Sequence, residues 1–511
     1  MKHVPSGITS FRELREGGYI YVDKTQLIEE LINSYKYVLL ARPKGFGKSI
    51  TLTTIEELFK GNRELFQGTA LYKKHQFNRF PIIKFNFRGL GRSVEEVKES
   101  LLEQLLHIVG ELDPTLRVKF RDKDKIRYYF RDLILQISKK ENSKVVILVD
   151  NYDNSVLESL FNLEMARQIW NILRDFLLVV KDYGEYIQFA FFTGITTILK
   201  RTPFEVSPVE DITLHPYFSN ICGFMYEEVL FYFDEFLQTV DMDMLKYWYY
   251  GYNFLGDFVF NPIDIISFIK NNYLFKPYWY MRISNEFFYR VLREQQFFLP
   301  EIEQMQAPEK IFNSFNLDYF MSESLAFHTG LITIESMKDT SFGTIFSFRP
   351  PNKMVQINLN DDLIRFITNK SSFFHFKKEL YISFKAGDIN KFRKTIRAIF
   401  ETLDPDHFVR YRFDKWRGIH ITLVYAYLMS LGGEMEIFES TTETITFSYQ
   451  LEGKVYLIRI SPQDSLKELL RTKYYDTIRA RRVVLLGLDF EKGEFNFSRI
   501  DWEVKEKYGV E

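Results

Sequence analysis

At 511 residues the chain is too long for one ordinary hydrophobic core, and about 150 residues per domain predicts about three domains. Its hydrophobic content of 46% and charged content of 26% are typical of a soluble globular protein. A formal net charge of -1 excludes the strongly basic balance that proteins committed to nucleic acid often have.

The single cysteine, Cys222, excludes an intrachain disulfide and fits a reducing compartment. The first ten residues lack the apolar core of a signal peptide, and no window has the length and hydropathy of a membrane span. We therefore expect a cytoplasmic protein with no membrane contact.

The first predicted helix follows Asp23, whose side chain can cap its N-terminus. Its apolar positions, from Leu27 to Ile32, fall on one helical face. A short apolar strand follows at residues 38–41, then a basic, glycine-containing loop that ends in Gly47-Lys48-Ser49, then a helix at residues 50–59. This order of strand, loop and helix is the context that a phosphate-binding loop requires.

Each residue type in this loop has a chemical reason to be there. Gly45 and Gly47 let the backbone turn so that its N–H groups face one anion, and the helix adds its positive N-terminal end. Lys48 would reach the outer phosphates and Ser49 would contribute a hydroxyl to a magnesium ion. The common pattern has glycine where this chain has Arg42, so a simple turn before a helix remains the alternative. The predicted nucleotide contacts in the loop are Arg42, Lys44, Gly45, Gly47, Lys48 and Ser49.

Three further buried strands are predicted at residues 80–87, 144–150 and 186–194, separated by helices near 94–108, 126–137 and 165–182. The helix after residue 93 begins with a Ser93-to-Glu96 capping box. Alternating buried strands and helices predict an α/β domain with a parallel sheet and a ligand at the carboxyl ends of its strands. Asp150 ends the third strand, where it would hold magnesium, although an acidic turn is the common alternative. Thr193 ends the fourth strand. It would lie beside the γ-phosphate if that strand lies between the strand before the loop and the strand that ends in Asp150.

Residues 224–275 are predicted to be helix-rich, with aromatic clusters and no catalytic constellation. His215 and His328 stand alone, and a structural role is the better interpretation of each. Residues 325–359 have a β-like pattern interrupted by Pro350-Pro351, which predicts a small winged-helix or β-hairpin connector.

The C-terminal part predicts helices at residues 389–400 and 420–431, the second ending at Gly432-Gly433. Strands follow at 434–438, 445–449 and 455–460, then a helix at 466–474 and strands at 483–488 and 495–500. Helix, three strands, helix and strand is the core order of a restriction-endonuclease-like fold. The whole chain is therefore predicted as an α/β protein with a phosphate-loop parallel sheet domain, a helical and mixed connector, and a restriction-endonuclease-like α/β C-terminal domain.

Taken together, these segments resemble the bacterial AAA-ATPase-like family, closely over residues 1–275 and in the right order. The matching stretches are FRELREGGYIYVDKTQLIEELI, ARPKGFGKSITL, VVILVDNYD, FFTGIT, LHPYFSNICGF, WYYGYNF and FNP. The resemblance implies that Arg42-Pro43 is a normal start for the loop. It also implies that Asp150 is the metal-holding residue and Thr193 the polar sensor, and that a nuclease domain of the PD-(D/E)XK type follows.

Asn151 is one departure from the family pattern, which usually has glutamate after the metal-holding aspartate. That glutamate is the base that polarises the attacking water, whereas an asparagine amide accepts no proton. Asp153 lies nearby, but two residues further along it would point elsewhere. Nucleotide binding should survive this change, and hydrolysis should be slow or absent.

The nuclease resemblance departs further. That chemistry needs an aspartate on one strand and a Glu-x-Lys on the next, to hold magnesium and activate water. The alignment puts Thr446, Arg459 and Ser461 at these positions, and Glu443 and Glu452 lie only at strand ends or turns. We therefore expect a catalytically inactive, degenerate nuclease-like domain. Four basic residues that lie close together in the sequence could contact nucleic-acid phosphates: Lys473, Arg479, Arg481 and Arg482. The alternative is that they belong to an ordinary solvated surface.

The predicted domains are 1–224, 225–371 and 372–511. The predicted function is an ATP-binding, magnesium-dependent switch with weak or no hydrolysis. The alternatives are an active ATPase, a module that binds DNA or RNA through the C-terminal domain, and an interaction protein with a vestigial nucleotide site. An oligomer is possible, and Arg201 is a candidate for the arginine that many AAA proteins supply to a neighbour.

Overall fold

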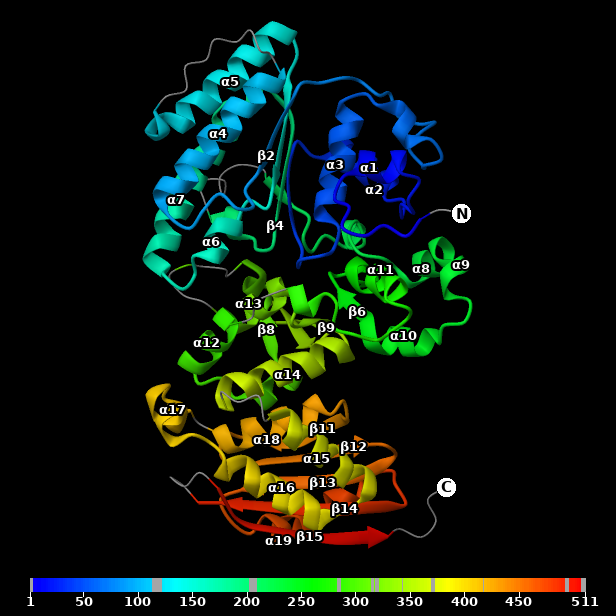
Figure 1. Ribbon diagram of the computed structural model, residues 1–511, viewed down its shortest axis with the longest axis vertical. Helices are drawn as coiled ribbons and strands as arrows, with labels where there is room; N and C mark the ends of the chain where they lie inside the picture. The colour runs from blue at the N-terminus through cyan, green and yellow to red at the C-terminus, as the bar shows by residue number, and fades with distance from the viewer. Residues whose placement is uncertain are drawn as a thin grey trace. The chain divides into compact units, whose positions relative to one another are not determined.

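Five parallel strands form the centre of the N-terminal part of the chain (Figure 1). The computed structural model describes residues 3–112, 122–201, 209–282, 286–313, 317, 321–341, 343–368, 373–416, 418–491 and 496–506. The chain divides into two units, the first made of Met1–Phe287 and Ala307–Ser347, the second of Phe288–Gln306 and Phe348–Glu511. The three-domain division stays a prediction, since these units divide the chain at other points.

The sheet of the first unit has the order β2-β3-β4-β1-β5, and every neighbouring pair is parallel. The predicted α/β domain with a parallel sheet is thus confirmed. Strand β4 lies between β1 and β3, which is the condition under which Thr193 was expected beside the γ-phosphate. The strands are β1 Tyr37–Ala41, β2 Ile82–Asn86, β3 Val145–Asp150, β4 Ile187–Gly194 and β5 Val209–Asp211.

Helices cover both faces of this sheet, with α1 to α3 on one side and α4, α5 and α7 on the other (Figure 1). Aromatic side chains fill the second interface: Phe130 of α5 and Phe176 of α7 stack with ring centroids 4.6 Å apart, and both contact Phe85 of β2. The helices are α1 Phe11–Glu16, α2 Thr25–Ser34, α3 Lys48–Phe59, α4 Val94–Leu112, α5 Ile126–Glu141, α6 Asn154–Glu158 and α7 Leu163–Asp182.

The predicted capping box is present before α4, whereas the N-cap of α2 is Lys24 and Asp23 lies one residue before it. The Asp23 carboxylate accepts hydrogen bonds from the Thr25 amide (2.9 Å) and hydroxyl (2.7 Å) at the start of α2. Before α4, the Ser93 hydroxyl accepts from the Glu96 amide and the Glu96 carboxylate accepts from the Ser93 amide, both at 3.3 Å. These bonds satisfy backbone donors that the helices themselves leave without partners.

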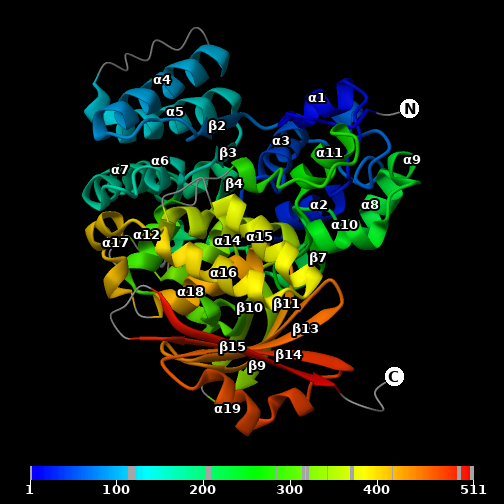
Figure 2. The same ribbon diagram turned by 60° about the horizontal axis from the view of Figure 1, so that its bottom comes forward.

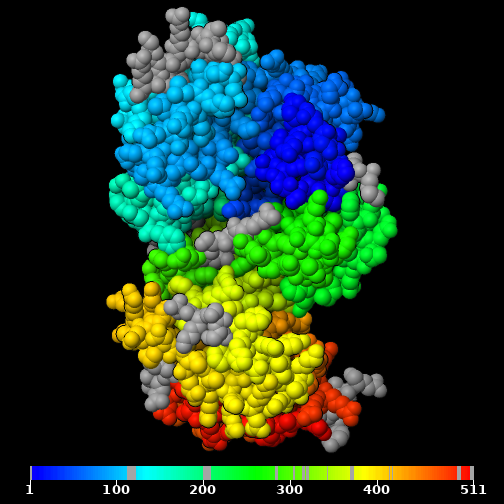
Figure 3. Space-filling view, in the orientation of Figure 1, coloured from blue at the N-terminus to red at the C-terminus, as the bar shows by residue number. Residues whose placement is uncertain are grey.

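The N-terminal segment packs against the helices that follow the sheet. Buried Lys24 pairs with Glu228 of α8, and the Tyr232 hydroxyl accepts from the Asp23 amide at 3.2 Å. Figure 3 shows this segment in dark blue directly against the green surface of α8 to α11. The later elements of the first unit are α8 Tyr226–Tyr232, α9 Asp234–Leu237, α10 Met242–Tyr249, β6 Tyr250–Asn253, β7 Phe258–Phe260, α11 Pro262–Lys270, α13 Ser322–Thr329 and β9 Thr333–Thr340, while β10 Gly343–Arg349 leads into the second unit.

The β-like prediction for residues 325–359 is partly wrong. Its centre forms β9 and β10, which are neighbours in a three-stranded sheet, but both ends are helical. The first end belongs to α13, and the second to α14, which spans Lys353–Thr368. The Asn352 side chain accepts from the Val355 amide at 3.1 Å and begins α14. A buried residue at every fourth position then continues the helix: Val355, Leu359, Leu363 and Ile367.

The second unit contains a five-stranded sheet in the order β11-β12-β13-β14-β15, in which only β13 and β14 pair in parallel. Figure 2 shows α19 beyond one face of this sheet and α16 and α18 on the other side. The elements are α12 Glu286–Glu294, which begins in the first unit, and α14, α15 Phe373–Ala386, α16 Ile389–Glu401, α17 Pro405–Arg410, α18 Ile419–Ser430, β11 Glu434–Ser440, β12 Ile445–Leu451, β13 Lys454–Ser461, α19 Ser465–Thr472, β14 Arg482–Phe490 and β15 Phe497–Glu506.

The alternation of side chains along β13 explains why helices cover both faces of the second sheet. The Tyr456 hydroxyl donates to the Phe384 carbonyl of α15, and its strand partner Tyr449 donates to the Leu428 carbonyl of α18, both at 2.8 Å. The next residue, Leu457, points to the opposite face, where it packs with Leu469 of α19. The predicted helices and strands of this part of the chain are present in the predicted order, and α15 and α17 are present in addition.

Candidate functional site: a phosphate-binding loop and its acidic partner

The loop between β1 and α3 has the backbone that its sequence predicts. Gly45 and Gly47 have φ angles of 89° and 97°, a region in which a side chain is strained. Gly47 lies immediately before α3, so the loop turns directly into a helix N-terminus. The chain thus brings backbone N–H groups and the positive end of a helix to one place, an arrangement suited to an anion.

Lys48 is folded back over this loop. Its Nζ donates to the carbonyl oxygens of Arg42 (2.8 Å) and Pro43 (3.0 Å), and the side chain is buried. Burial lowers the pKa of the Lys48 ammonium, while the charges of Asp150 and Asp153 partly oppose this shift. Neutral carbonyls are weaker acceptors than a phosphate oxygen, so an anion in the loop would be a better partner for this cation.

Asp150, the last residue of β3, joins the first turn of α3 to the end of β4. One carboxylate oxygen accepts from the Ser49 hydroxyl at 2.6 Å, and the other accepts from the Thr193 hydroxyl at 2.5 Å. All three residues were predicted from sequence, and the structure brings them into one hydrogen-bonded cluster at the carboxyl ends of β3 and β4. Hydroxyl and carboxylate oxygens are the ligand types that magnesium prefers.

Asn151 follows Asp150 in the left-handed conformation, with φ of 58°. Its amide nitrogen donates to the Asn86 side-chain oxygen at 3.1 Å, at the end of the neighbouring strand β2. At the position where the family pattern has a glutamate as general base, the chain therefore has a neutral amide that Asn86 orients. Asp153 does point elsewhere: its carboxylate accepts from the Ile195 and Thr196 amides after β4.

The prediction for Arg42 needs correction. Its guanidinium is buried, donates to the carbonyl oxygens of Thr213 (2.5 Å) and Ser219 (3.2 Å), and lies 4.0 Å from the centre of the Phe254 ring. These contacts give the side chain a structural role, because its two Nη groups are directed to backbone carbonyls. We exclude the Arg42 side chain from the candidate phosphate contacts, while its carbonyl remains an acceptor for Lys48.

Sequence reasoning missed the aromatic support of the loop. Phe46 is fully buried, with its ring 4.8 Å from that of Tyr252 and 5.5 Å from that of Phe254, centre to centre. The segment WYYGYNF, which showed no catalytic pattern, therefore holds the loop in place. The sequence does carry a signal for this support, which is the phenylalanine between two glycines. A large apolar side chain in a turn indicates that the turn is packed against other residues and is not exposed to solvent.

Alanine substitutions at the two loop glycines should lower the free energy of unfolding by unequal amounts. A Cβ at Gly47 would meet nothing within 4 Å, so Gly47→Ala should cost only the backbone strain, about 1 kcal/mol. A Cβ at Gly45 would lie 2.7 Å from Ile263 Cδ1 and 3.1 Å from Trp279 Cδ1. Gly45→Ala should therefore lower the free energy of unfolding by about 2–4 kcal/mol. Urea unfolding of both variants checks this, and equal losses would contradict the packing described.

His328 is buried beside the loop that follows β4, and its Nε2 lies 3.1 Å from the Phe312 carbonyl oxygen. Burial lowers its pKa to about 4. Below pH 6.5 His328 binds a proton in the unfolded chain but stays neutral in the folded chain. Its contribution to the free energy of unfolding is therefore complete above pH 6.5 and is lost as the pH falls toward 4.

This shift predicts a loss of about 3 kcal/mol in the free energy of unfolding between pH 6.5 and pH 4 from His328 alone. Urea unfolding measured at several pH values gives the free energy of unfolding as a function of pH. This free energy should fall less steeply with falling pH in His328→Gln than in the wild type, because the glutamine side chain does not titrate. Parallel curves for the two proteins would show that His328 is not held neutral by burial. His215 packs against Phe218, and neither histidine joins the phosphate-loop cluster.

In the second unit, the three positions aligned with nuclease residues are held by ordinary polar contacts. Arg459 pairs with Glu439 and donates to the Thr446 hydroxyl at 2.6 Å. Ser461 shares a hydrogen bond of 2.7 Å with Ser465 at the start of α19. A carboxylate, Glu439, therefore lies beside these positions, and its charge is neutralised by Arg459. Across the described residues, no group of three or more His, Cys, Asp or Glu side chains could hold a metal ion.

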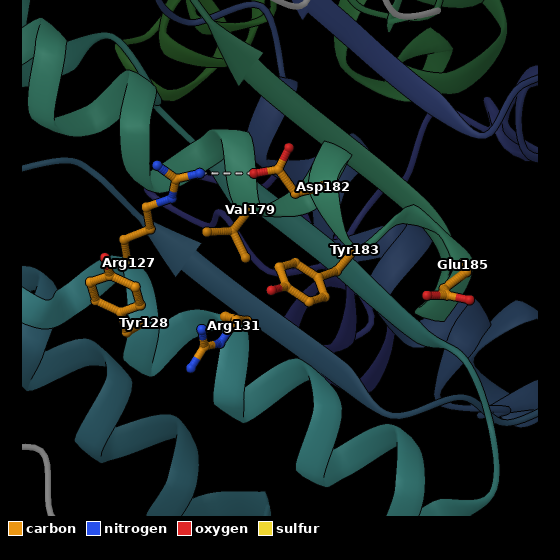
Figure 4. A pocket seen from close by; sticks show the side chains of 7 residues that line it. All are labelled: Arg127, Tyr128, Arg131, Val179, Asp182, Tyr183 and Glu185. Carbon is orange, nitrogen blue, oxygen red and sulfur yellow. Dashed lines mark hydrogen bonds and ion pairs between the residues drawn. The ribbon is translucent and has the colours of Figure 1, made fainter.

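A pocket of about 480 Å³ lies away from the phosphate loop, between α5 and the end of α7 (Figure 4). Its two arginines already have acidic partners, Arg127 with Asp182 at 2.9 Å and Arg131 with Asp132 at 2.7 Å. An anion would have to break these pairs, so this pocket is the weaker candidate. The Arg201 side chain lies outside the described residues, and its predicted role stays a prediction.

Within the part of the chain that the structure describes, no helix combines the length and the hydropathy that crossing a membrane requires.

Comparison with known proteins supports the interpretation of the N-terminal part. Residues 5–204 match the family model of a predicted AAA-ATPase. An uncharacterized protein in the vnfD 5' region of Azotobacter chroococcum mcd 1 is 29% identical over 505 residues, covering 96% of this chain and 97% of that protein. A structure of Drosophila ORC bound to AT-rich DNA and Cdc6 matches at 10% identity over 69% of this chain and 91% of that chain. Its TM-score of 0.19 carries no argument. The chain is thus similar to predicted AAA-ATPases over residues 5–204, and its nuclease resemblance stays a prediction.

Proposed function

We propose that this chain binds ATP with magnesium and acts as a nucleotide-dependent switch with weak or no hydrolysis. The cluster of Ser49, Asp150 and Thr193 beside Lys48 carries the proposal. Three hydroxyl and carboxylate groups from separate segments meet next to a buried cation and a helix N-terminus, which is more than an ordinary turn requires. The match of residues 5–204 to predicted AAA-ATPases supports the same assignment.

Each residue has a role in this proposal. Magnesium would draw on the oxygens of Ser49 and Asp150, and when bound it would neutralise phosphate charge. Lys48 would transfer its hydrogen bonds from the loop carbonyls to the outer phosphates. Thr193 would hold Asp150 in orientation and present a hydroxyl near the last phosphate. Lys44, Gly45 and Gly47 would contribute backbone N–H groups.

The weak hydrolysis follows from Asn151, whose amide cannot take a proton from water. An active ATPase remains the alternative, in which another group acts as the base. Phosphate release that depends on magnesium and disappears in Lys48→Ala would favour the active enzyme.

Thermal unfolding tests nucleotide binding at low cost. A ligand that binds only the folded chain at 100 times its Kd adds about 2.7 kcal/mol, so Mg·ATP should raise Tm by several degrees. Mg·AMP, which lacks the outer phosphates, serves as the control and should give a much smaller rise. Equal shifts with both nucleotides, or no shift with either, would contradict the proposed site.

For the C-terminal part we propose a degenerate nuclease-like domain without cleavage activity, because Arg459 lies where a metal-binding carboxylate would be required.

A second candidate function is binding of DNA or RNA. Its support is the exposure of four basic side chains around the start of β14: Lys473, Arg479, Arg481 and Arg482. Binding should weaken steeply with salt and with Arg481→Glu and Arg482→Glu together. The exposed pair Lys139→Glu and Lys140→Glu is the matched control.

A further inference from the structure

The candidate phosphate loop is held from outside by a later stretch of the chain. Each of its residues 42–46 contacts a residue between positions 213 and 330. Arg42 donates to the Thr213 carbonyl, Pro43 packs beside Gly330, the Lys44 carbonyl accepts from Asn261, Gly45 lies against Ile263 and Trp279, and the Phe46 carbonyl accepts from Gly223. The proposed nucleotide site therefore depends on a segment far from it in sequence.

Asn261 makes two hydrogen bonds with different purposes. Its side-chain oxygen accepts from the Ile263 amide at 3.0 Å and caps α11. Its amide nitrogen donates to the Lys44 carbonyl at 3.1 Å, inside the loop. The side chain is completely buried, so water cannot replace either partner. One residue thus fixes the start of a helix and the orientation of a loop peptide.

The orientation of that peptide decides where a loop N–H points. A trans peptide is planar, with its C=O and N–H directed to opposite sides. Because Asn261 holds the Lys44 carbonyl, the Gly45 N–H is directed away from Asn261. The same holds two peptides further on, where the Gly223 amide donates to the Phe46 carbonyl at 3.0 Å and turns the Gly47 N–H away. Two glycine N–H groups are thereby fixed before any ligand arrives.

We infer that Asn261 is a positioning residue for polyphosphate binding, acting through the Lys44 carbonyl to orient the Gly45 N–H. The inference rests on the proposed function and adds to it a residue more than 200 positions from the loop. A donor that is fixed in advance costs a ligand less ordering entropy, so loss of this hydrogen bond weakens binding without removing a ligand contact. The coupling also links nucleotide binding to α11.

Asn261→Asp separates the two hydrogen bonds. The carboxylate keeps an acceptor for the Ile263 amide, but at pH 8 it has no hydrogen to donate to Lys44. Asn261→Ser is the second variant, since serine also caps a helix and is too short to bridge both partners. Asn162→Asp is the matched control, because Asn162 caps α7 through the Met165 amide at 3.1 Å, away from the loop.

Two readouts decide the matter. Hydrogen exchange of loop peptides covering residues 42–48, measured without nucleotide, should accelerate about tenfold in both Asn261 variants and stay unchanged in Asn162→Asp. The Kd for Mg·ATP, from calorimetric titration, should rise about tenfold in the same two variants. A change in global stability alone would raise exchange along the whole chain, whereas the positioning role predicts an increase confined to the loop and the start of α11.

The outcomes distinguish this inference from the proposed function. If the wild-type chain binds no Mg·ATP, the proposed function fails. If the wild type binds and both Asn261 variants bind equally well with unchanged loop exchange, the positioning role is overturned while the nucleotide site stands. Faster loop exchange together with weaker binding, absent from Asn162→Asp, supports the role of Asn261.

Discussion

Lys48→Ala is expected to raise the Kd for Mg·ATP at least about 100-fold. The ammonium now donates to the Arg42 and Pro43 carbonyls and would exchange these partners for phosphate oxygens. A hydrogen bond to a charged group contributes about 1.5–3 kcal/mol, and 1.4 kcal/mol is a factor of ten in Kd. Two such bonds therefore account for the expected loss.

Lys60→Ala is the matched control for this variant. Lys60 follows the same helix, and its side chain is 42% exposed and paired with Glu56 at its surface. It should bind nucleotide as the wild type does. Wild-type affinity in Lys48→Ala, measured on folded protein, would mean that nucleotide binds elsewhere or that the loop carries no phosphate.

Asn151→Glu is expected to create or increase hydrolysis. A positioned general base contributes about 10²–10⁴-fold to a rate, and the glutamate would place a proton acceptor directly after Asp150. We expect phosphate release to rise at least about tenfold. The gain is limited because Asn151 has a left-handed φ of 58°, a conformation that asparagine adopts more easily than glutamate.

Asn151→Gln provides the comparison that isolates the proton acceptor. Glutamine has the length of glutamate and the same backbone cost, but its amide accepts no proton. Phosphate release should therefore stay at the wild-type level in Asn151→Gln and rise in Asn151→Glu. A wild type that already turns over ATP quickly, with no gain in Asn151→Glu, would show that another group is the base.

The phosphate loop, Asp150 and Thr193 could be predicted because short, local patterns specify them. A buried strand followed by glycines and Lys-Ser leaves few alternative structures, and polar residues at the ends of parallel strands meet at one edge of a sheet. The place of β4 between β1 and β3 was only a condition for the role expected of Thr193, and the sheet order meets that condition. The N-cap of α4 was visible in the same way, since a capping box involves only four residues.

What could not be predicted depends on contacts between distant segments. Nothing local to Arg42 shows that its guanidinium is taken up by the carbonyls of Thr213 and Ser219. Nothing local to Asn261 shows that its amide holds Lys44. The helix α14 was mistaken for strand because the apolar residues Val355, Ile357 and Leu359 alternate with polar residues in a short window. Burial at every fourth residue becomes visible only over its full length of Lys353–Thr368.

The most direct test of the account is calorimetric titration of the purified full-length chain with Mg·ATP, followed by phosphate release on the same sample. We predict saturable binding with about one nucleotide per chain, lost in Lys48→Ala and kept in Lys60→Ala, with phosphate release near background. Absence of binding in the wild type would contradict the nucleotide site, and rapid phosphate release would contradict the role assigned to Asn151.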